Sequence, residues 1–340
     1  MSEVETKEAA DLSTAAVTHG TLYIMREQDY LSGALFDYYK IGIVRGEKDV
    51  KKRESEHSTA NPRKISSIIE IQSPEVQKLE THLHNTYAMH RVSSGEWFFL
   101  PGDLVDQVIN DANQLAEKLA QLETFRSVAT EVVKQAHVDP AIQATDQLIE
   151  LGQELARLRK QGKEVSAIKA KIVDRMREIA AQDEAYSHLF KIREVKATIT
   201  WDGASFKKEN KELDSQFRNL VSTKWTPKWI QDFAEDVYEA EVVADVVALS
   251  DPIDLHAKYL EFWKVEAQTK WEIDALELQI HAATGTAQRL EGVVEWTEKT
   301  TTRFDQESLK AAYPELYEKY LVEKPAVTQK TPAEWVSYAR

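Results

Sequence analysis

The segment that begins at Ser73 carries the clearest chemical signal in the sequence. A Ser, a Pro and an acid in this order are typical of a helix start, and we expect a helix from there to about residue 89. At 100° per residue, Glu80 lies near the middle of the apolar face of this helix, with His84 one turn later. A carboxylate in such a place is costly unless it meets a cation or a metal ion. Glu80 is therefore predicted either to form a buried salt bridge, with Arg53 as the obvious partner, or to bind a metal.

A second group of polar side chains is expected on a helix over residues 48–58. Arg53 and His57 are four residues apart, so they share one face of this helix. A guanidinium can hold the non-bridging oxygens of a phosphodiester while a nearby base activates water. The pair therefore suits phosphodiester cleavage, although the same face could be an ordinary solvated basic edge.

Two short β-prone runs, 21–25 and 38–43, are expected to form a hairpin with a long loop. Tyr23 and Lys40 each lie between apolar residues, so strand alternation directs both to the face opposite their neighbours. A phenol and an amine held close together could tune each other toward general-base work. The alternative is an ordinary strand tyrosine and a solvated lysine.

The elements that position these residues predict an α+β N-terminal domain. A third strand is expected over 65–71, after the breaker Asn61-Pro62, and the segment ends with an aromatic run over 95–101. The candidate residues thus come from two strands and two helices that are well separated in the chain.

Five motifs in this order make residues 19–101 similar to a known family. They are Leu22-Tyr23-Ile24, Lys40-Ile41-Gly42, Arg53 with His57, Glu80 with Leu83-His84, and Gly95-Glu96-Trp97-Phe98. The segment resembles the GIY-YIG nuclease superfamily, and more narrowly its phage-encoded branch, in which KIG replaces YIG and a GEWF ending is typical.

The resemblance implies a small mixed sheet with flanking helices and one Mg²⁺ or Mn²⁺ held chiefly by Glu80. Arg53 would be the phosphate-binding cation. Tyr23 would act as the base or position the attacking water, helped by Lys40, and His57 would be an auxiliary base or phosphate contact. These five residues are the catalytic set that the resemblance predicts.

Supporting roles follow from the same resemblance. His84 would lie behind the metal ligand, and Glu96 would lock the final turn onto the core. Lys40 stands where the best-understood members have a Tyr, so proton transfer here is expected to differ from theirs.

After residue 102 the sequence predicts a mostly α-helical extension with short β-hairpins. Apolar stripes over 148–158 and 165–179, separated by 161–163, predict an antiparallel helical hairpin. Thr226-Pro227 is expected to cap a further helix, and Asp251-Pro252 another.

The extension also contains a faint internal echo. Residues 197–209 and 293–307 share a β-prone run with Trp, then Phe and Glu, which suggests that a helix-then-hairpin unit occurs twice, although the match is short enough to arise by chance. Residues 294–317 are similar to the accessory tail of YqaJ-type viral recombination exonucleases. That tail contains no catalytic residues, so it implies only a phage-like context in DNA metabolism.

Composition limits the class of protein. The chain has 340 residues, no Cys and a net charge of -14, so disulfides, zinc-thiolate sites and thiol nucleophiles are excluded. No apolar run can span a bilayer, and we expect a soluble protein of the cytoplasm, the host's if the gene is a phage's. The expected divisions are a flexible tail over 1–18, a nuclease-like domain over 19–102, and helical regions over 103–225 and 226–340.

Three functions are compatible with these patterns. The first is a metal-dependent DNA endonuclease, which retention of the whole catalytic set favours. The second is a catalytically silent phage factor that binds DNA or protein, as a regulator or counter-defence protein. The third is an interaction protein whose acidic helical region engages a host or phage partner or forms a homo-oligomer. Sequence residues 19–101 are charge-neutral, so the excess acid lies outside the nuclease-like segment.

Overall fold

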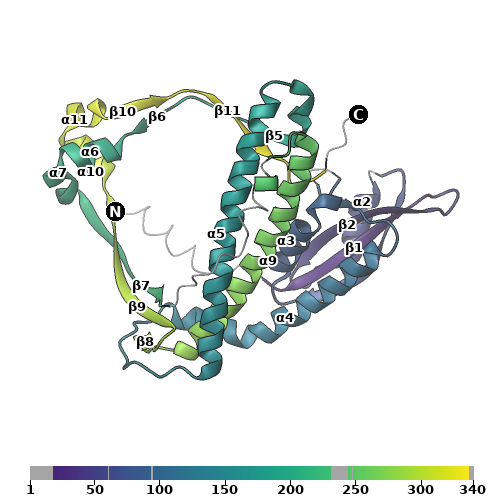
Figure 1. Cartoon of the computed structure of the whole chain (residues 1–340), viewed down its shortest axis with the longest axis horizontal. Helices are drawn as coiled ribbons and strands as arrows, with labels where there is room; N and C mark the ends of the chain where they lie inside the picture. Colours follow the sequence, from purple (N-terminus) through teal and green to yellow (C-terminus); the bar gives the residue numbers. More distant parts are fainter. Residues whose placement is uncertain (1–17, 60, 93–94, 231–243, 247, 337–340) are drawn as a thin grey trace, which may run out of the picture.

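The protein has three parts arranged side by side (Figure 1). A computed structural model describes residues 18–59, 61–92, 95–230, 244–246 and 248–336. A small sheet with its helices lies on one side, two long helices lie in the middle, and a frame of paired strands and short helices lies on the other side. The expected flexible tail, save residue 18, lies outside the described residues.

The N-terminal sheet has four strands in the order β3-β1-β2-β4. Their bounds are β1 Gly20–Gln28, β2 Leu35–Arg45, β3 Lys64–Ser73 and β4 Trp97–Phe99. Every pairing in this sheet is antiparallel, so the prediction of a mixed sheet was wrong in this respect. The α+β class itself is confirmed, because the sheet is flanked by helices and followed by a largely helical region.

Strand alternation gives the sheet two different apolar faces. Leu22, Ile24 and Ile41 belong to the core beneath α3 (Val76–Thr86) and α4 (Leu104–Val132). Tyr23 and Met25 belong to a smaller cluster beneath α2 (Val50–Thr59). The period of two thus separates the structural face from the face that carries Tyr23 and Lys40.

The expected helical hairpin after residue 145 is instead one continuous helix, α5 (Asp146–Ala180). Gly162 does not break it, because a single glycine costs a helix only about 1 kcal/mol and tertiary packing compensates. The two apolar stripes of α5 lie against α9 (Pro252–Thr284), which runs antiparallel to it. Leu155 belongs to one apolar cluster with Ile280, and Ile172 belongs to another with Leu255. The antiparallel partner of α5 is therefore a distant helix.

The long helix α9 also holds the N-terminal sheet domain in place. Trp271 of α9 belongs to the same core as α3 and α4. Lys78 of α3 donates to Asp274 at 2.7 Å, and its ammonium lies 5.5 Å from the centre of the Trp271 ring. The sheet domain is thus attached to the helix pair by both apolar and charged contacts.

Thr226-Pro227 does not begin a helix, as we expected, but lies in the strand β7 (Arg218–Trp229). This strand pairs with β9 (Val294–Phe304) in an antiparallel ribbon, extended at its base by β8 (Arg289–Leu290). Pro227 is tolerated because β7 is an edge strand, where a missing N–H is not needed for a second partner. Residues 231–243, into which the expected helix would continue, lie outside the described residues.

The far end of the frame contains a duplicated unit. Each copy is a strand, two short helices and a strand, and the first strand of one copy pairs with the last strand of the other. The copies are β6 (Thr198–Trp201), α6 (Gly203–Glu209), α7 (Lys211–Gln216) and β7, and then β9, α10 (Gln306–Ala312), α11 (Pro314–Lys319) and β10 (Leu321–Lys324).

The register of this duplication differs from the echo noted in the sequence. Trp201 corresponds to Phe304, not to Trp296, because the residues that follow them, Asp202 and Asp305, each cap the next helix. Each of these Asp residues also donates its backbone N–H to the carbonyl just before the last strand of the other copy. A shared aromatic core containing Phe206 joins the two copies. Trp296 lies instead at the base of the ribbon.

The remaining elements connect these parts. They are the short helices Ala88–His90 and Glu184–Leu189 and the strand pair β5 (Phe190–Val195) and β11 (Val327–Pro332). The boundary expected at residue 225 falls inside β7, and both expected helical regions contribute to the helix pair and to the frame. Among the described residues, no helix is long and apolar enough to cross a membrane.

Candidate active site

An open cleft of about 610 Å³ lies where α3 meets the β2–β4 edge of the sheet. It collects residues from four parts of the N-terminal domain. The charged or titratable side chains in its lining are Lys40, Glu80, His84, Arg91 and Glu96. Four of these five were expected at the site from the sequence.

Glu80 is a buried carboxylate, with only 7% of the residue exposed. The Gln77 amide donates a hydrogen bond to it at 2.8 Å. Burial, and then the Glu96 carboxylate, raise the pKa of Glu80 to about 7. The salt bridge to Arg53 that we considered is absent: Arg53 pairs with Glu56 at 2.8 Å, and no described Lys or Arg forms an ion pair with Glu80.

Lys40 and Glu96 form the central ion pair of the cleft. The Lys40 Nζ lies 2.5 Å from the Glu96 carboxylate, and the Lys40 residue is 8% exposed while the Glu96 side chain is 43% exposed. The backbone of β2 also bonds to this turn, since Ile41 N–H donates to Glu96 O at 3.0 Å. Glu96 is therefore bonded to β2 through both its backbone and its side chain, and its carboxylate lines the cleft.

Tyr23 lies opposite Gly42 on the neighbouring strand. A Cβ at position 42 would be 2.6 Å from the Tyr23 hydroxyl oxygen, so only a glycine leaves room for the ring. Burial, and then Glu96, raise the pKa of Tyr23 to about 12. The expected tuning of the phenol toward a base by Lys40 is thus not seen, and the hydroxyl remains a proton donor at neutral pH.

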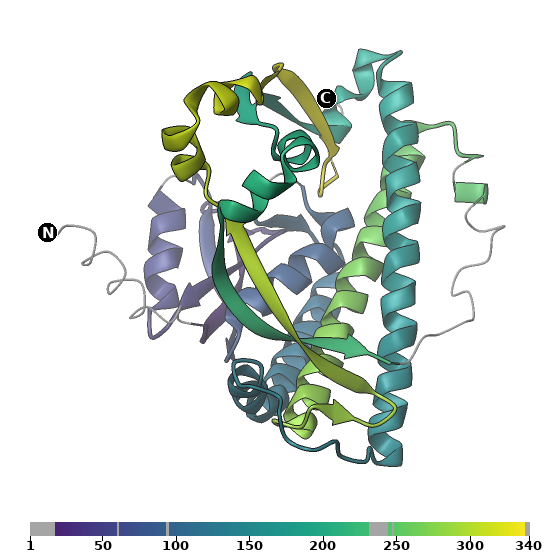
Figure 2. The same cartoon turned by 90° about the vertical axis from the view of Figure 1, so that its left-hand side faces the viewer.

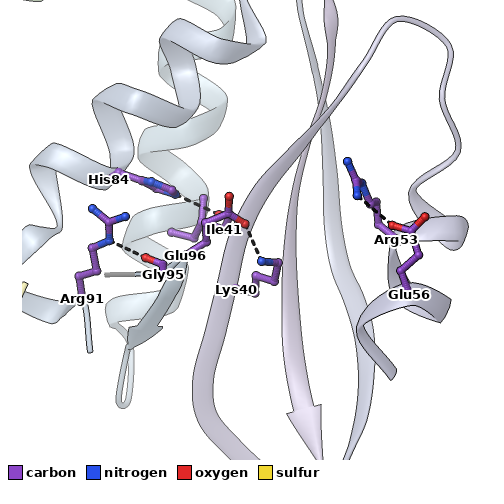
Figure 3. A network of polar contacts seen from close by, with 8 residues as sticks. All are labelled: Lys40, Ile41, Arg53, Glu56, His84, Arg91, Gly95 and Glu96. Atoms are coloured by element: carbon purple, nitrogen blue, oxygen red, sulfur yellow. Dashed lines mark hydrogen bonds and ion pairs between the residues drawn. The ribbon is translucent and has the colours of Figure 1, made fainter. Parts of the chain in front are cut away.

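Tyr23, Arg53 and His57 do not line this cleft, although the charges of Lys40 and Glu96 act on His57, which like Arg53 comes from α2. Figure 3 shows Arg53 on the α2 side of the strands, with the Lys40–Glu96 pair between it and His84. His57 is partly buried, and its Nε2 has no hydrogen-bond partner among the described residues. Burial, and then the charge of Lys40, lower the pKa of His57, so the imidazole is neutral near pH 7.

His84 is a positioning group beneath the cleft. Its Nε2 lies 3.0 Å from the Ile41 carbonyl oxygen, which can only accept, so the neutral ring donates from this nitrogen. The ring also lies 5.2 Å from that of Phe98, and burial lowers the pKa of His84 to about 4. His84 therefore links α3 to β2 directly below Lys40 and Gly42.

The donor set is compatible with one divalent cation. Among the described residues no group of three or more His, Asp and Glu side chains could enclose a metal. Mg²⁺ is commonly bound by one or two carboxylates and keeps several waters, which agrees with Glu80 and the neighbouring Glu96 in an open cleft. A cation there would supply the positive charge that Glu80 lacks.

Four lining residues were not identified from the sequence. Gln77, Thr81 and Asn85 lie on the cleft side of α3, where helical periodicity places them on the same face as Glu80 and His84, so a sequence signal was available. Arg91 follows the short helix after α3 and donates through Nε to the Gly95 carbonyl at 2.7 Å (Figure 3). No local pattern marks Arg91, because only the tertiary fold returns the chain to the cleft at this point.

Comparison with known proteins gives one finding for this segment. Residues 20–113 match the T5orf172 domain, a phage-associated domain of the GIY-YIG/HNH-like endonuclease type. The match covers the sheet, α2, α3 and the first part of α4, and leaves the long helices and the frame outside it. Neither the curated proteins nor the solved structures include a significant match to this chain.

Proposed function

We propose that the protein is a metal-dependent DNA endonuclease that hydrolyses phosphodiester bonds at the Glu80 cleft. The main support is a single observation: Glu80 is a buried carboxylate that opens on a cleft, lies beside Glu96 and has no ion-pair partner among the described residues. Keeping such a group ionised costs free energy, and a divalent cation removes that cost. The T5orf172 match over residues 20–113 agrees with a nuclease-like domain.

Glu80 would hold the cation, and the negative charge of Glu96 in the same cleft would also attract it. When bound, Mg²⁺ or Mn²⁺ would act as a Lewis acid on the phosphate and lower the pKa of a coordinated water. Lys40 holds Glu96 in place and partly offsets its charge. Arg53 would bind the non-bridging phosphate oxygens, because its guanidinium is half-exposed and offers donors beyond the single bond to Glu56.

The proton-transfer roles follow from the raised pKa of Tyr23 and the lowered pKa of His57. Tyr23 keeps its proton, so it would orient the attacking water or a phosphate oxygen as a hydrogen-bond donor. His57 is neutral, and its buried Nε2 has no hydrogen-bond partner among the described residues, so it would serve as the base once substrate binding brings water to it. His84 would keep α3 and β2 in register beneath the reacting atoms.

The test is cutting of supercoiled and branched DNA by the full chain in Mg²⁺, Mn²⁺ or EDTA, alongside Glu80→Ala. We expect metal-dependent cutting by the wild type and a loss of at least about 10³-fold in the variant. His82→Ala, at a partly buried histidine of the same helix that lies outside the cleft lining, is the matched control. No cutting by a folded wild-type protein would reject the proposal and favour a binding or counter-defence role.

A further inference from the structure

The ribbon formed by β7 and β9 has two unlike faces. At the base of the ribbon, one face carries Trp229 and Trp296 and is anchored on the helix pair; Trp296 is 1% exposed there and stacks on His137 at 3.8 Å between ring centres. The opposite face is exposed to solvent, and in Figure 2 the ribbon crosses in front of the helices. The exposed cations of that face are Lys224, Lys228, Lys299 and Arg303.

Two of these cations oppose each other directly. Lys224 and Lys299 are partners in the strand register, and like charges in this position destabilise a ribbon. Neither Lys forms an ion pair with any described residue, and the same holds for Lys228 and Arg303. Other ribbon cations are neutralised: Arg218, on the anchored side, bonds to Asp214 at 2.6 Å.

The intervening side chains of the free face are mostly hydroxyls. Thr226 and Thr297 lie between Lys228 and the lysine pair, and Ser222 and Thr301 lie between that pair and Arg303. Among the described residues of this face, Glu295 is the one carboxylate, and Arg289 already bonds to it at 3.0 Å. The hydroxyls of Thr226 and Thr297 donate to each other's backbone carbonyls, so what this face offers a ligand is chiefly its unneutralised cations, on a chain whose net charge is -14.

We propose that this face of the β7–β9 ribbon binds the sugar-phosphate backbone of duplex DNA. From 295 to 303 the stripe is about 26 Å long at roughly 3.3 Å per residue, and a duplex places one negative charge per about 1.7 Å of its axis. A two-stranded ribbon also fits a major groove about 12 Å wide. The choice of DNA over other polyanions rests on the proposed nuclease function. The contacts are with phosphates, so binding is independent of base sequence.

The ribbon and the Glu80 cleft lie on opposite sides of the α5–α9 pair (Figure 1). The ribbon would thus retain DNA by a contact that is separate from the cutting site. Retention by a separate basic surface is useful to an acidic protein, because its overall field opposes approach to DNA.

The test uses the full chain in EDTA, where metal-dependent cutting does not occur. Binding of a fluorescent 30-base-pair DNA duplex is measured as a function of salt for the wild type and Lys224→Glu. The variant places a carboxylate opposite Lys299, so the melting temperature should not fall. We expect the Kd to rise about tenfold at low salt and the slope of log Kd against log salt to decrease by roughly one.

The matched control is Lys171→Glu, at an exposed lysine of α5 that has no ion pair among the described residues. It changes the net charge equally and should leave the Kd within about twofold of the wild-type value. An equal loss in both variants, or none in Lys224→Glu, would overturn the proposal. Tighter binding of an RNA duplex, or an altered oligomer mass with unaltered DNA affinity, would also overturn it.

These outcomes separate the two proposals. A tenfold effect of Lys224→Glu in a protein that never cuts DNA supports the ribbon and rejects the nuclease. Normal cutting together with wild-type DNA affinity in Lys224→Glu rejects the ribbon alone.

Discussion

The Glu80 cleft and the β7–β9 ribbon are opposite solutions to the placement of charge. In the cleft, one carboxylate is buried at 7% exposure and has no cation within ion-pair distance among the described residues. On the ribbon, Lys224 and Lys299 are exposed, oppose each other and have no described carboxylate partner. Both arrangements cost stability, and both cease to do so when a ligand of opposite charge binds.

The burial of the charge decides what that ligand is. A buried carboxylate has room for a small ion, and its raised pKa reports the cost of isolating the charge. Exposed, regularly spaced cations are weak partners for a single ion, because solvent screens them, but they sum along an extended polyanion. The same chain thus has one site suited to a metal and one surface suited to a phosphate backbone.

Beyond the loss expected for Glu80→Ala, the largest effect is expected at Arg53, the proposed phosphate contact. Arg53→Lys should lower the rate of metal-dependent DNA cutting by about 100-fold, because a point charge cannot replace the planar fork of the guanidinium. The measurement is single-turnover cutting at saturating protein. Glu56→Gln, which removes the pairing carboxylate and keeps Arg53, should stay within about threefold of the wild type. Full activity of Arg53→Lys would reject Arg53 as the phosphate contact and leave only the ribbon as a proposed phosphate-binding surface.

A second prediction tests the buried charge without using activity. The folded-state pKa of Glu80 is about 7 and its ordinary value is 4.5, so the folded state binds the proton more tightly. Stability is therefore present below about pH 4.5 and is lost as the pH rises toward 7. In EDTA at pH 8, Glu80→Gln should be more stable than the wild type by about 3 kcal/mol, and the gain should vanish at pH 4.5.

Urea unfolding at the two pH values measures this difference. Mg²⁺ should then raise the stability of the wild type but not that of the variant, because only the wild type retains the carboxylate ligand. A variant that is less stable than the wild type at pH 8 would show that the carboxylate is already compensated, and the contrast with the ribbon would fail.

Gly42 tests the geometry of the cleft. An alanine there would bring its Cβ to 2.6 Å from the Tyr23 hydroxyl oxygen, so the buried ring must move. Gly42→Ala should lower the free energy of unfolding by about 2 kcal/mol, and it should reduce cutting as well. Thermal unfolding in EDTA and a cutting assay measure the two effects. Unchanged stability and activity would mean that the ring position is not important.

The smallest expected effect concerns the scaffold that separates the two regions. Gly162 lies inside α5, and an added Cβ would make an ordinary contact at 3.7 Å with Thr269 of α9. Gly162→Ala should therefore raise the free energy of unfolding by about 0.5–1 kcal/mol. Urea unfolding would detect this gain. A loss of stability would contradict the continuous helix.

Local periodicity was sufficient to predict much of the N-terminal domain. Strand alternation placed Tyr23 and Lys40 on one face, and helical periodicity placed Glu80 on the buried side of its helix, because both patterns depend only on neighbouring residues. The same reasoning failed where partners are distant. We predicted a turn at residues 161–163 and a helix start at Thr226-Pro227. The local sequence does not show that the first segment packs against α9 or that the second pairs with β9.

The sequence by itself therefore determined which groups are available and which face of each element carries them. The tertiary structure decided how the charges are paired. In the folded protein Arg53 pairs with Glu56 and Lys40 pairs with Glu96, whereas Glu80 has no ion-pair partner among the described residues. Lys224 lies opposite Lys299, which is 75 residues later in the chain. Ion pairing depends on distances of a few ångströms between segments that are far apart in sequence, and only the packed fold sets those distances.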